Sequence, residues 1–283
     1  MRKLIPAFAL CLIFTGCARF LPWNRPVNSA LPDRGLVLHY TFEEQDAEKA
    51  VDRSGLENHG VIHGQPVIVP GPGGRALRFD GEKDYIQVPR SPSLEPDALT
   101  AAAWVRINRF HPNFGLLVQK RNRSFHNNED YNLQIWNNGV IRMVVANGRQ
   151  SRLDAANRIG TGVWHHVAMV FEEPEMRLYL DGRFAGSKRH PLPLDHNPES
   201  DLLICAAGHA QYPLDLFLNC DLDDLQIYSQ ALSDDDIAEL VRRHLRHAPA
   251  PAADPGPVYS IVTAPDENAP IRPQTPDNLL DPP

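Results

Sequence analysis

Short runs of alternating apolar and polar residues, separated by turns rich in glycine, asparagine and aspartate, recur through the middle of the chain. A period of two sends successive side chains to opposite faces, which is typical of a half-buried β-strand. The pattern predicts strands at Leu36–Phe42, Ala76–Phe79, Tyr85–Val88, Thr100–Ile107, Gly115–Gln119, Tyr131–Trp136, Val140–Ala146, Trp164–Phe171, Met176–Leu180, Leu202–Ala206 and Leu222–Tyr228. Short strands at this spacing predict an all-β fold, an antiparallel two-sheet jelly-roll sandwich.

Two of the turns are strong hairpin signals. Asn137-Asn138-Gly139 separates two expected strands, and Asp181-Gly182 follows a third. These residue types tolerate the positive φ angles that tight hairpins need. The flanking strands are therefore expected to pair as antiparallel neighbours.

One short helix is predicted near the end of this region, from Asp234 to about Leu245. Ser233 is placed to cap its first turn, where three aspartates follow, and Arg242 and His244 lie in its last turn. Acidic residues at the start and basic residues at the end both suit the helix dipole. The sandwich is thus expected to close with one C-terminal helix.

The first residues have the features of a secretory signal. Arg2 and Lys3 precede the apolar stretch Leu4–Phe14, which is too short to span a membrane, and small residues precede Cys17. The segment resembles a bacterial lipobox, although Phe14 stands where leucine is usual. That resemblance implies cleavage after residues 1–16 and lipidation of Cys17. An ordinary signal cleaved nearby, or a free Cys17, is the alternative.

Acyl chains on Cys17 would anchor the protein to an envelope membrane. Ala18 follows the lipidated residue, and under the usual sorting rule this favours the outer membrane of a bacterium. Residues 17–34 are expected to be a tether, 35–247 the β domain, and 248–283 a proline-rich disordered tail. The membrane is expected to be met through the lipid alone.

Charge narrows the choice of partners. The formal net charge is −7 and the sequence pI is about 5.9, so the chain has no basic field for nucleic acid. Hydrophobic residues make up 42% of the chain, enough for a sizeable core.

Four cysteines are present, and two of them fall at the N-terminus. Cys11 lies within the expected signal and Cys17 takes the lipid, which leaves Cys205 and Cys220. Two remaining cysteines in an exported protein predict a disulfide. Two free thiols are the alternative.

Several segments, taken in order, resemble the laminin-G-like, concanavalin A-like jelly-roll domain. They are Leu36–Phe42, Asp52–Gly55, Asn58–Gly60, Ala76–Gly81, Asp84–Pro89, Ala103–Val105, Trp164–Ala168, Leu178–Gly182, Leu222–Tyr228 and Ala231–Ser233. The resemblance covers residues 36 to about 245 and implies the jelly-roll fold. It does not imply one function, because such domains bind sugars, proteins or no known ligand.

The cysteines depart from the family's pattern. Cys205 and Cys220 occupy positions where these domains usually carry glycine, and a paired replacement is what a disulfide would produce. A bond closing a loop of this length would contribute on the order of 3 kcal/mol.

The resemblance also implies a structural Ca²⁺ ion. Strand alternation places Asp223 on the same face as Leu225 and Ile227, and a carboxylate buried there needs a partner. In many family members a Ca²⁺ ion joins this aspartate to the loop that begins here at Asp52, and Asn58 would add an oxygen. Alternatively, Asp223 caps a turn or pairs with an arginine.

One expected strand presents a candidate ligand face. Asn132, Gln134 and Trp136 point away from the core, and Arg142 in the paired strand is expected to join them. Amides beside an exposed ring suit a sugar, which needs apolar stacking together with directional hydrogen bonds. The alternative is an ordinary solvated face with Trp136 packed under a loop.

Glu44, Asp46 and Glu48 superficially match the alternating carboxylates of laminarinase-like glycosidases. Two carboxyls about 5 Å apart would suit retaining hydrolysis. The run contains alanine and lysine but no β-branched residue, however, and its position in the family's pattern is a variable polar loop. No catalytic residue is therefore predicted.

The sequence thus predicts a non-catalytic, lipid-anchored envelope module that binds carbohydrate or a protein partner. A polysaccharide hydrolase and a structural envelope protein without a specific ligand are the alternatives.

Overall fold

The structure of the protein is a computed structural model that describes residues 34–44, 48–121, 129–196, 200–209 and 212–247. The first described strand begins at Leu36 and the helix ends at His247. The expected signal, the lipidation residue Cys17 and the proline-rich tail lie outside the described residues. Within the described part of the chain, no helix has the length and apolarity that a membrane crossing requires.

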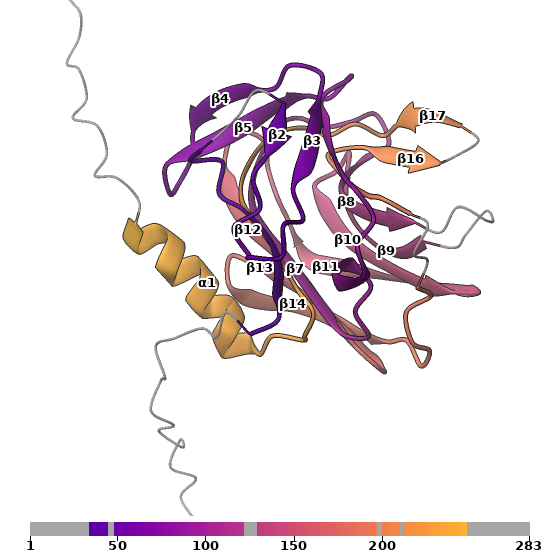
Figure 1. The fold of residues 1–283 in the computed structure, drawn as a ribbon. Helices are drawn as coiled ribbons and strands as arrows, with labels where there is room; N and C mark the ends of the chain where they lie inside the picture. The colour runs from indigo at the N-terminus through magenta and orange to yellow at the C-terminus, as the bar shows by residue number, and fades with distance from the viewer. Residues whose placement is uncertain (1–33, 45–47, 122–128, 197–199, 210–211, 248–283) are drawn as a thin grey trace, which may run out of the picture. The chain divides into compact units, whose positions relative to one another are not determined.

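Two large antiparallel sheets make up most of the described chain (Figure 1). Sheet A runs, in spatial order, through β14 (Arg183–Arg189), β13 (Glu175–Leu180), β12 (Trp164–Glu172), β7 (Leu99–Arg109), β18 (Asn219–Tyr228), β5 (Arg75–Asp80) and β4 (Val67–Pro70), with β1 (Leu36–Tyr40) paired to β18. Sheet B runs through β11 (Arg149–Arg158), β10 (Val140–Asn147), β9 (Glu129–Trp136), β8 (Phe114–Arg121), β15 (Leu202–Ile204), β6 (Tyr85–Val88), β3 (Gly60–His63) and β2 (Lys49–Ala50). The predicted fold class is confirmed.

Two shorter features complete the strands. β16 (Ala207–His209) and β17 (Tyr212–Asp215) form a separate hairpin, and a 3₁₀ turn spans Pro92–Leu94. Both lie in connections between the strands of the two large sheets.

The main core lies between the inner faces of sheets A and B. Its buried side chains come from alternate strand positions, as a period of two requires. Tyr40, Phe79, Ile107, Met169 and Ile204 are among its members, and each is fully buried. Burial of this apolar surface is the main stabilising contribution to the fold.

The predicted Asn-Gly turn joins β9 to β10. Gly139 has φ +80, and a Cβ atom on it would collide with the backbone carbonyl of Ile159. Only glycine satisfies both conditions without strain. The turn therefore sets the register in which Arg142 lies opposite Gln134.

The predicted helix is present as α1 (Asp234–His247), outside the sandwich (Figure 1). Ser233 accepts the amide N–H of Asp236 through its hydroxyl oxygen, and the Asp236 carboxylate accepts the N–H of Ser233. This reciprocal pair is a capping box with aspartate as the acidic member. A second apolar cluster, which includes Tyr179, Ile237 and Leu240, packs the helix on the outer face of sheet A.

Candidate functional site

Three of the four predicted ligand residues meet on the outer face of sheet B. Trp136 donates its indole N–H to Gln134 Oε1 over 3.0 Å. The Arg142 guanidinium lies 4.3 Å from the centroid of the Trp136 ring, and the Phe114 ring stacks on the same indole at 4.9 Å. We call these residues, with Asp154, the aromatic–arginine cluster.

Asp154 holds the guanidinium of this cluster in place. Its carboxylate accepts hydrogen bonds from Arg142 Nε and Nη2 at 2.5 and 2.8 Å, which is the paired geometry of a guanidinium and a carboxylate. The hydrogen bond from Arg142 is the main cause of a lowered pKa for Asp154. Asp154 is half exposed, so the ion pair lies at the surface where a ligand could reach it.

Asn132 is the exception among the four. It shares the outer face with Gln134 but is 0% exposed, whereas the cluster reaches solvent through Trp136 and Arg142. A ligand on this face would therefore meet those two side chains and Asp154. The prediction that Asn132 contacts ligand does not fit its burial.

In the Asp52 loop, predicted to hold Ca²⁺, protein N–H and O–H groups donate hydrogen bonds to both carboxylate oxygens of Asp52. Asp52 Oδ1 accepts the N–H groups of His39 and Ser54 at 2.8 and 2.9 Å. Its Oδ2 accepts the Ser54 hydroxyl at 2.7 Å and the N–H of Asn58 at 2.9 Å. The Asn58 amide group donates to the carbonyl of Val37. Asp52 and Asn58 are thus brought together, and their hydrogen bonds hold the loop in place.

Asp223 does not join them. The sequence places it on the core face with Leu225, but a bulge follows Asp223 in β18, and Asp224 adopts φ 47. Leu222 and Leu225, three residues apart, both face the core. The bulge therefore turns Asp223 to the outer face of sheet A, and the face predicted for it is wrong.

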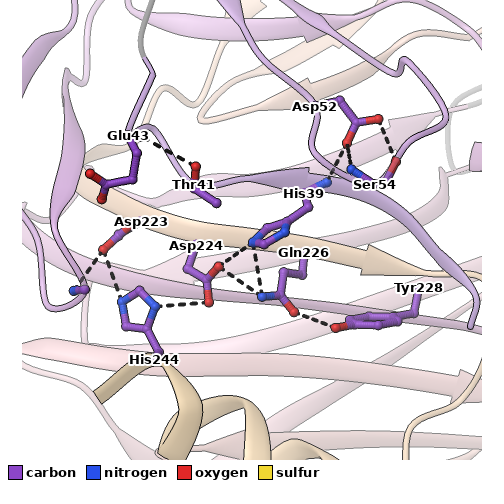
Figure 2. Close-up of polar contacts among 11 residues, drawn as sticks. His39, Thr41, Glu43, Asp52, Ser54, Asp223, Asp224, Gln226, Tyr228 and His244 are labelled. Atoms are coloured by element: carbon purple, nitrogen blue, oxygen red, sulfur yellow. Dashed lines mark hydrogen bonds and ion pairs between the residues drawn. The ribbon is translucent and has the colours of Figure 1, made fainter. Parts of the chain in front are cut away.

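On that outer face lies a polar network that the sequence reasoning missed (Figure 2). His39 of β1 contacts Asp224 of β18 through Nε2 and Oδ1 at 2.6 Å. The other oxygen of Asp224 lies 3.2 Å from Nδ1 of His244, and Nε2 of His244 lies 3.2 Å from Asp223. Gln226 donates a further hydrogen bond to Asp224. We call His39, Asp223, Asp224, Gln226 and His244 the histidine–aspartate network.

The side chains of the network are largely buried from solvent. Side-chain exposure is 2% at Asp223, 14% at Asp224 and 10% at His244. Burial works to lower the pKa of His244, but its two carboxylate partners outweigh burial and raise that pKa to about 9. Burial raises the pKa of Asp223, whereas the two histidines hold the pKa of Asp224 well below its usual range. His244 is therefore a buried imidazolium between two carboxylates at neutral pH.

Aromatic contacts cover the network from the sheet side. The Trp104 ring stacks on His244 at 5.5 Å and meets His166 edge-on at the same centroid distance. Burial lowers the pKa of His166 to about 4, so this ring stays neutral beside the charged one. The arrangement fastens the last turns of α1 to β1 and β18, and we assign it a structural role.

The fit to a Ca²⁺ ion can be judged from these partners. Figure 2 shows Asp52 and Asp223 on either side of the His39–Asp224 pair, each with its own set of contacts. Both oxygens of Asp52 already accept N–H or O–H donors, which a cation would have to displace. Among the described residues, no group of three or more His, Cys, Asp and Glu side chains has a metal-binding arrangement. The predicted trio of Asp52, Asn58 and Asp223 does not fit a shared ion.

Cys205 and Cys220 lie next to each other in the main core. Their sulfur atoms are 3.7 Å apart, both side chains are buried, and both are free thiols in the structure. Cys205 has φ +64, the backbone conformation that favours glycine. The two residues are therefore neighbours, as a disulfide requires, although the structure contains no bond between them.

Two of the three carboxylates that resemble a glycosidase's catalytic residues are described in the structure, and both are exposed. Glu44 is exposed and its carboxylate pairs with Arg53, while Glu48 is exposed just before β2. Asp46 lies outside the described residues. Glu44 and Glu48, the described carboxylates of this run, are thus both solvent-exposed.

Residues 80–238, more than half of the 283-residue chain, match the family model of the concanavalin A-like lectin/glucanases superfamily. The chain belongs to this superfamily. A search by sequence against curated proteins found no match. The match agrees with the resemblance inferred from the sequence, and it includes the strands from β6 to β18.

Solved structures support the fold at low identity. The binding domain of Paraclostridial Mosquitocidal Protein 1 is 17% identical with a TM-score of 0.60, covering 74% of this chain and 52% of that one. Domain 4 of AbnA, a GH43 extracellular arabinanase from Geobacillus stearothermophilus in complex with arabinotriose, is 16% identical with a TM-score of 0.60, covering 73% and 98%. Trypanosoma rangeli sialidase with the inhibitor DANA is 17% identical with a TM-score of 0.59, covering 75% and 33%. The chain thus spans about half of the first structure and a third of the sialidase.

Proposed function

We propose that this protein is a non-catalytic carbohydrate-binding module held at a bacterial envelope membrane by lipid on Cys17. The observation that carries the proposal is the aromatic–arginine cluster on the outer face of sheet B. It joins two stacked rings, an amide, a guanidinium and a carboxylate within one surface patch. Sugars are recognised by this mixture of apolar surface and fixed polar groups.

The cluster is organised before any ligand arrives. Asp154 orients the Arg142 guanidinium, and Gln134 fixes the tilt of the Trp136 ring. Side chains that are already ordered lose little conformational entropy on binding, so a shallow site of this kind retains useful affinity. The remaining donors of Arg142 and the acceptors of Asp154 would then face the hydroxyl groups of a sugar.

A binding role also agrees with the solved structures. One similar domain belongs to an arabinanase and was solved with arabinotriose, and another is the binding domain of a mosquitocidal protein. Glu44 and Glu48, the described carboxylates weighed for hydrolysis, are solvent-exposed. We therefore favour binding over hydrolysis.

The lipid anchor belongs to the same proposal. The lipobox-like segment before Cys17 supports it, and Ala18 supports the outer membrane. Anchoring would display the β domain at an envelope surface, where polysaccharides are within reach. Metabolic labelling with palmitate tests this part, because Cys17→Ser should abolish the label and release the protein from membranes.

The binding proposal is tested by screening the purified chain against a glycan array, with and without a chelator. Trp136→Ala is expected to weaken binding of any captured neutral glycan by about tenfold, since ring contact is lost. Phe184→Ala is the matched control, because Phe184 is a 54% exposed aromatic on the edge of sheet A. Binding should be unchanged by the chelator.

Two results would overturn the proposal. One is the absence of binding to every glycan under both conditions. The other is capture of a neutral glycan that Trp136→Ala and Arg142→Gln both leave at wild-type strength, which would place the site elsewhere.

A further inference from the structure

A row of side chains crosses the open half of the outer face of sheet A, opposite the half that α1 covers. Arg78 of β5, Asp221 of β18, Arg106 of β7 and Trp164 of β12 stand in register on four neighbouring strands. We call these four residues the arginine row. On β18, Asp221 of the row precedes Asp223 by two residues, and no residue of the row belongs to the histidine–aspartate network.

One buried carboxylate holds both guanidiniums of the row. Asp221 is 0% exposed and accepts hydrogen bonds from Arg78 at 2.7 and 3.0 Å and from Arg106 at 2.8 and 2.5 Å. Asn108 donates to the same carboxylate at 2.9 Å. Burial works to raise the pKa of Asp221, but these donors outweigh it and lower the pKa. Asp221 is therefore ionised and fixes the position of both arginines.

Two cations share one anion, so the row carries a surplus of one positive charge at a sheet surface. Arg78 is 47% exposed and Arg106 is 24% exposed, and each has N–H donors left beyond those that Asp221 accepts. Arg106 also lies 4.9 Å from the centroid of the Trp164 ring. Preorganised guanidinium forks beside a ring suit an oxyanion, such as a carboxylate or a sulfate, attached to a framework with apolar faces.

A groove of about 560 Å³ adjoins the row. Arg78 of the row lines it together with Asn108, which neighbours the row, and its other polar residues are Gln65, Asp80, Glu82, Lys83, Asp84, Arg109 and Asn219. Arg109 pairs with Glu82 at 3.7 Å, which balances those two charges. The groove therefore offers hydroxyl-binding amides and carboxylates next to the anion-binding guanidiniums.

The carboxylates of the groove decide the class of ligand. Asp80 accepts three backbone N–H groups, and Asp84 is buried and accepts the N–H of Gln65. These carboxylates, with Glu82, are acceptors for hydroxyl groups, which a sugar has in number and a phosphodiester backbone largely lacks, so the groove suits a sugar better than nucleic acid. A sugar with one acidic substituent and several hydroxyls can place its acidic group on the arginine row and its hydroxyls in the groove.

We propose that the arginine row and its groove form a second saccharide site, which binds a sugar bearing a carboxylate or sulfate group. The inference rests on the proposed carbohydrate-binding function and deepens it by naming an acidic ligand. The acidic group contacts Arg78 and Arg106, Trp164 contacts the ring carbons, and Asn108 contacts hydroxyls.

The test measures binding of the full mature chain to three polymers by calorimetry. Polygalacturonate carries carboxylates, dextran sulfate carries sulfates, and dextran is the neutral reference. At least one acidic polymer is expected to bind, with affinity that falls as salt rises, because the contact is electrostatic. Comparison of the two acidic polymers distinguishes carboxylate from sulfate recognition.

Arg78→Gln is expected to weaken binding of the acidic polymer by about tenfold, since a charge-assisted pair is lost. Arg78 is half exposed and Asp221 keeps Arg106 and Asn108, so the fold should persist; circular dichroism checks this. Arg78→Lys keeps the charge without the fork and should bind about threefold more weakly than wild type. Arg183→Gln, an exposed arginine on β14, is the matched control.

The outcomes separate the two proposals. Acidic-polymer binding that Arg78→Gln and Arg183→Gln leave equally strong overturns the arginine row alone. Acidic-polymer binding lost equally in those two variants also overturns it, because net charge then explains the effect. Failure of the glycan array and of all three polymers overturns the carbohydrate function and the row together.

Discussion

The positions of the Asp223 and Cys205 side chains both depend on irregular backbone conformations, which the alternation of residues in the sequence does not predict. A bulge after Asp223 reverses the phase of alternation in β18, and Asp224 adopts a positive φ there. Asp223 consequently meets His244 at 3.2 Å and not the Asp52 loop. The alternation of β9, in contrast, places Gln134 and Trp136 on one face as predicted, because that strand pairs regularly with β10.

His244 gives the protein a stability that depends on pH. Its pKa in the folded chain is about 9, above the ordinary value of 6.5, so folding favours the protonated form. The stabilisation is complete below pH 6.5 and is lost as pH rises through about 9. We expect the free energy of unfolding to fall by on the order of 3 kcal/mol across this window. Urea unfolding at several pH values measures it.

His244→Gln should remove most of that alkaline loss while lowering stability at neutral pH, because two buried carboxylates lose their cation. His111→Gln, on the loop between β7 and β8, is the control and should keep the wild-type pH profile. An unchanged alkaline slope in His244→Gln would contradict the charge assigned to the network.

At the scale of elements, the predicted strands are those with continuous alternation or apolar runs. Tyr85–Val88 is found with the same bounds, and β7 and β12 extend the predictions by one or two residues. The sequence pattern does not predict β2, β3, β4, β11, β14, β16 or β17. Of these, β11 (Arg149–Arg158) and β14 (Arg183–Arg189) are edge strands rich in charged and small residues. Edge strands take their conformation from the ladder beside them, so local composition reveals little of it.

The helix differs from the edge strands, because hydrogen bonds between residues close in sequence determine where it begins. Ser233 accepts the N–H of Asp236 at 3.2 Å and donates its hydroxyl to the Asp236 carboxylate at 2.6 Å. Ser233→Ala should lower the free energy of unfolding by about 1 kcal/mol and increase amide exchange in the first turn of α1. Ser233→Thr retains the oxygen and is expected to stay near wild type. Equal exchange in the alanine and threonine variants would refute the capping role.

At the scale of the whole molecule, Cys205 and Cys220 connect the two sheets. Cys205 follows β15 of sheet B, and Cys220 belongs to β18 of sheet A. Burial raises the pKa of the Cys220 thiol well above its ordinary value, so the folded core holds a poorly reactive thiol. Oxidation is therefore expected during folding in an oxidising compartment, before the core closes.

Protein recovered from such a compartment should show no free thiol at Cys205 or Cys220 when alkylated in denaturant without reductant. Mass spectrometry of the alkylated chain reads this directly. The paired change Cys205→Ser with Cys220→Ser should lower the free energy of unfolding by on the order of 3 kcal/mol relative to the oxidised protein. Alkylation of both thiols would show that the cysteines stay reduced.

The sequence by itself determined the fold class, most inner strands, the capped helix and the turn residues, because these follow from periodicity and from local hydrogen bonding. It also brought Gln134, Trp136 and Arg142 together, since regular pairing preserves their shared face. Only the tertiary structure decided which charges meet. The histidine–aspartate network and the arginine row join residues more than 100 positions apart, and a single bulge decides which surface Asp223 faces. Contacts of that kind depend on how strands are ordered across a sheet, which no local pattern records.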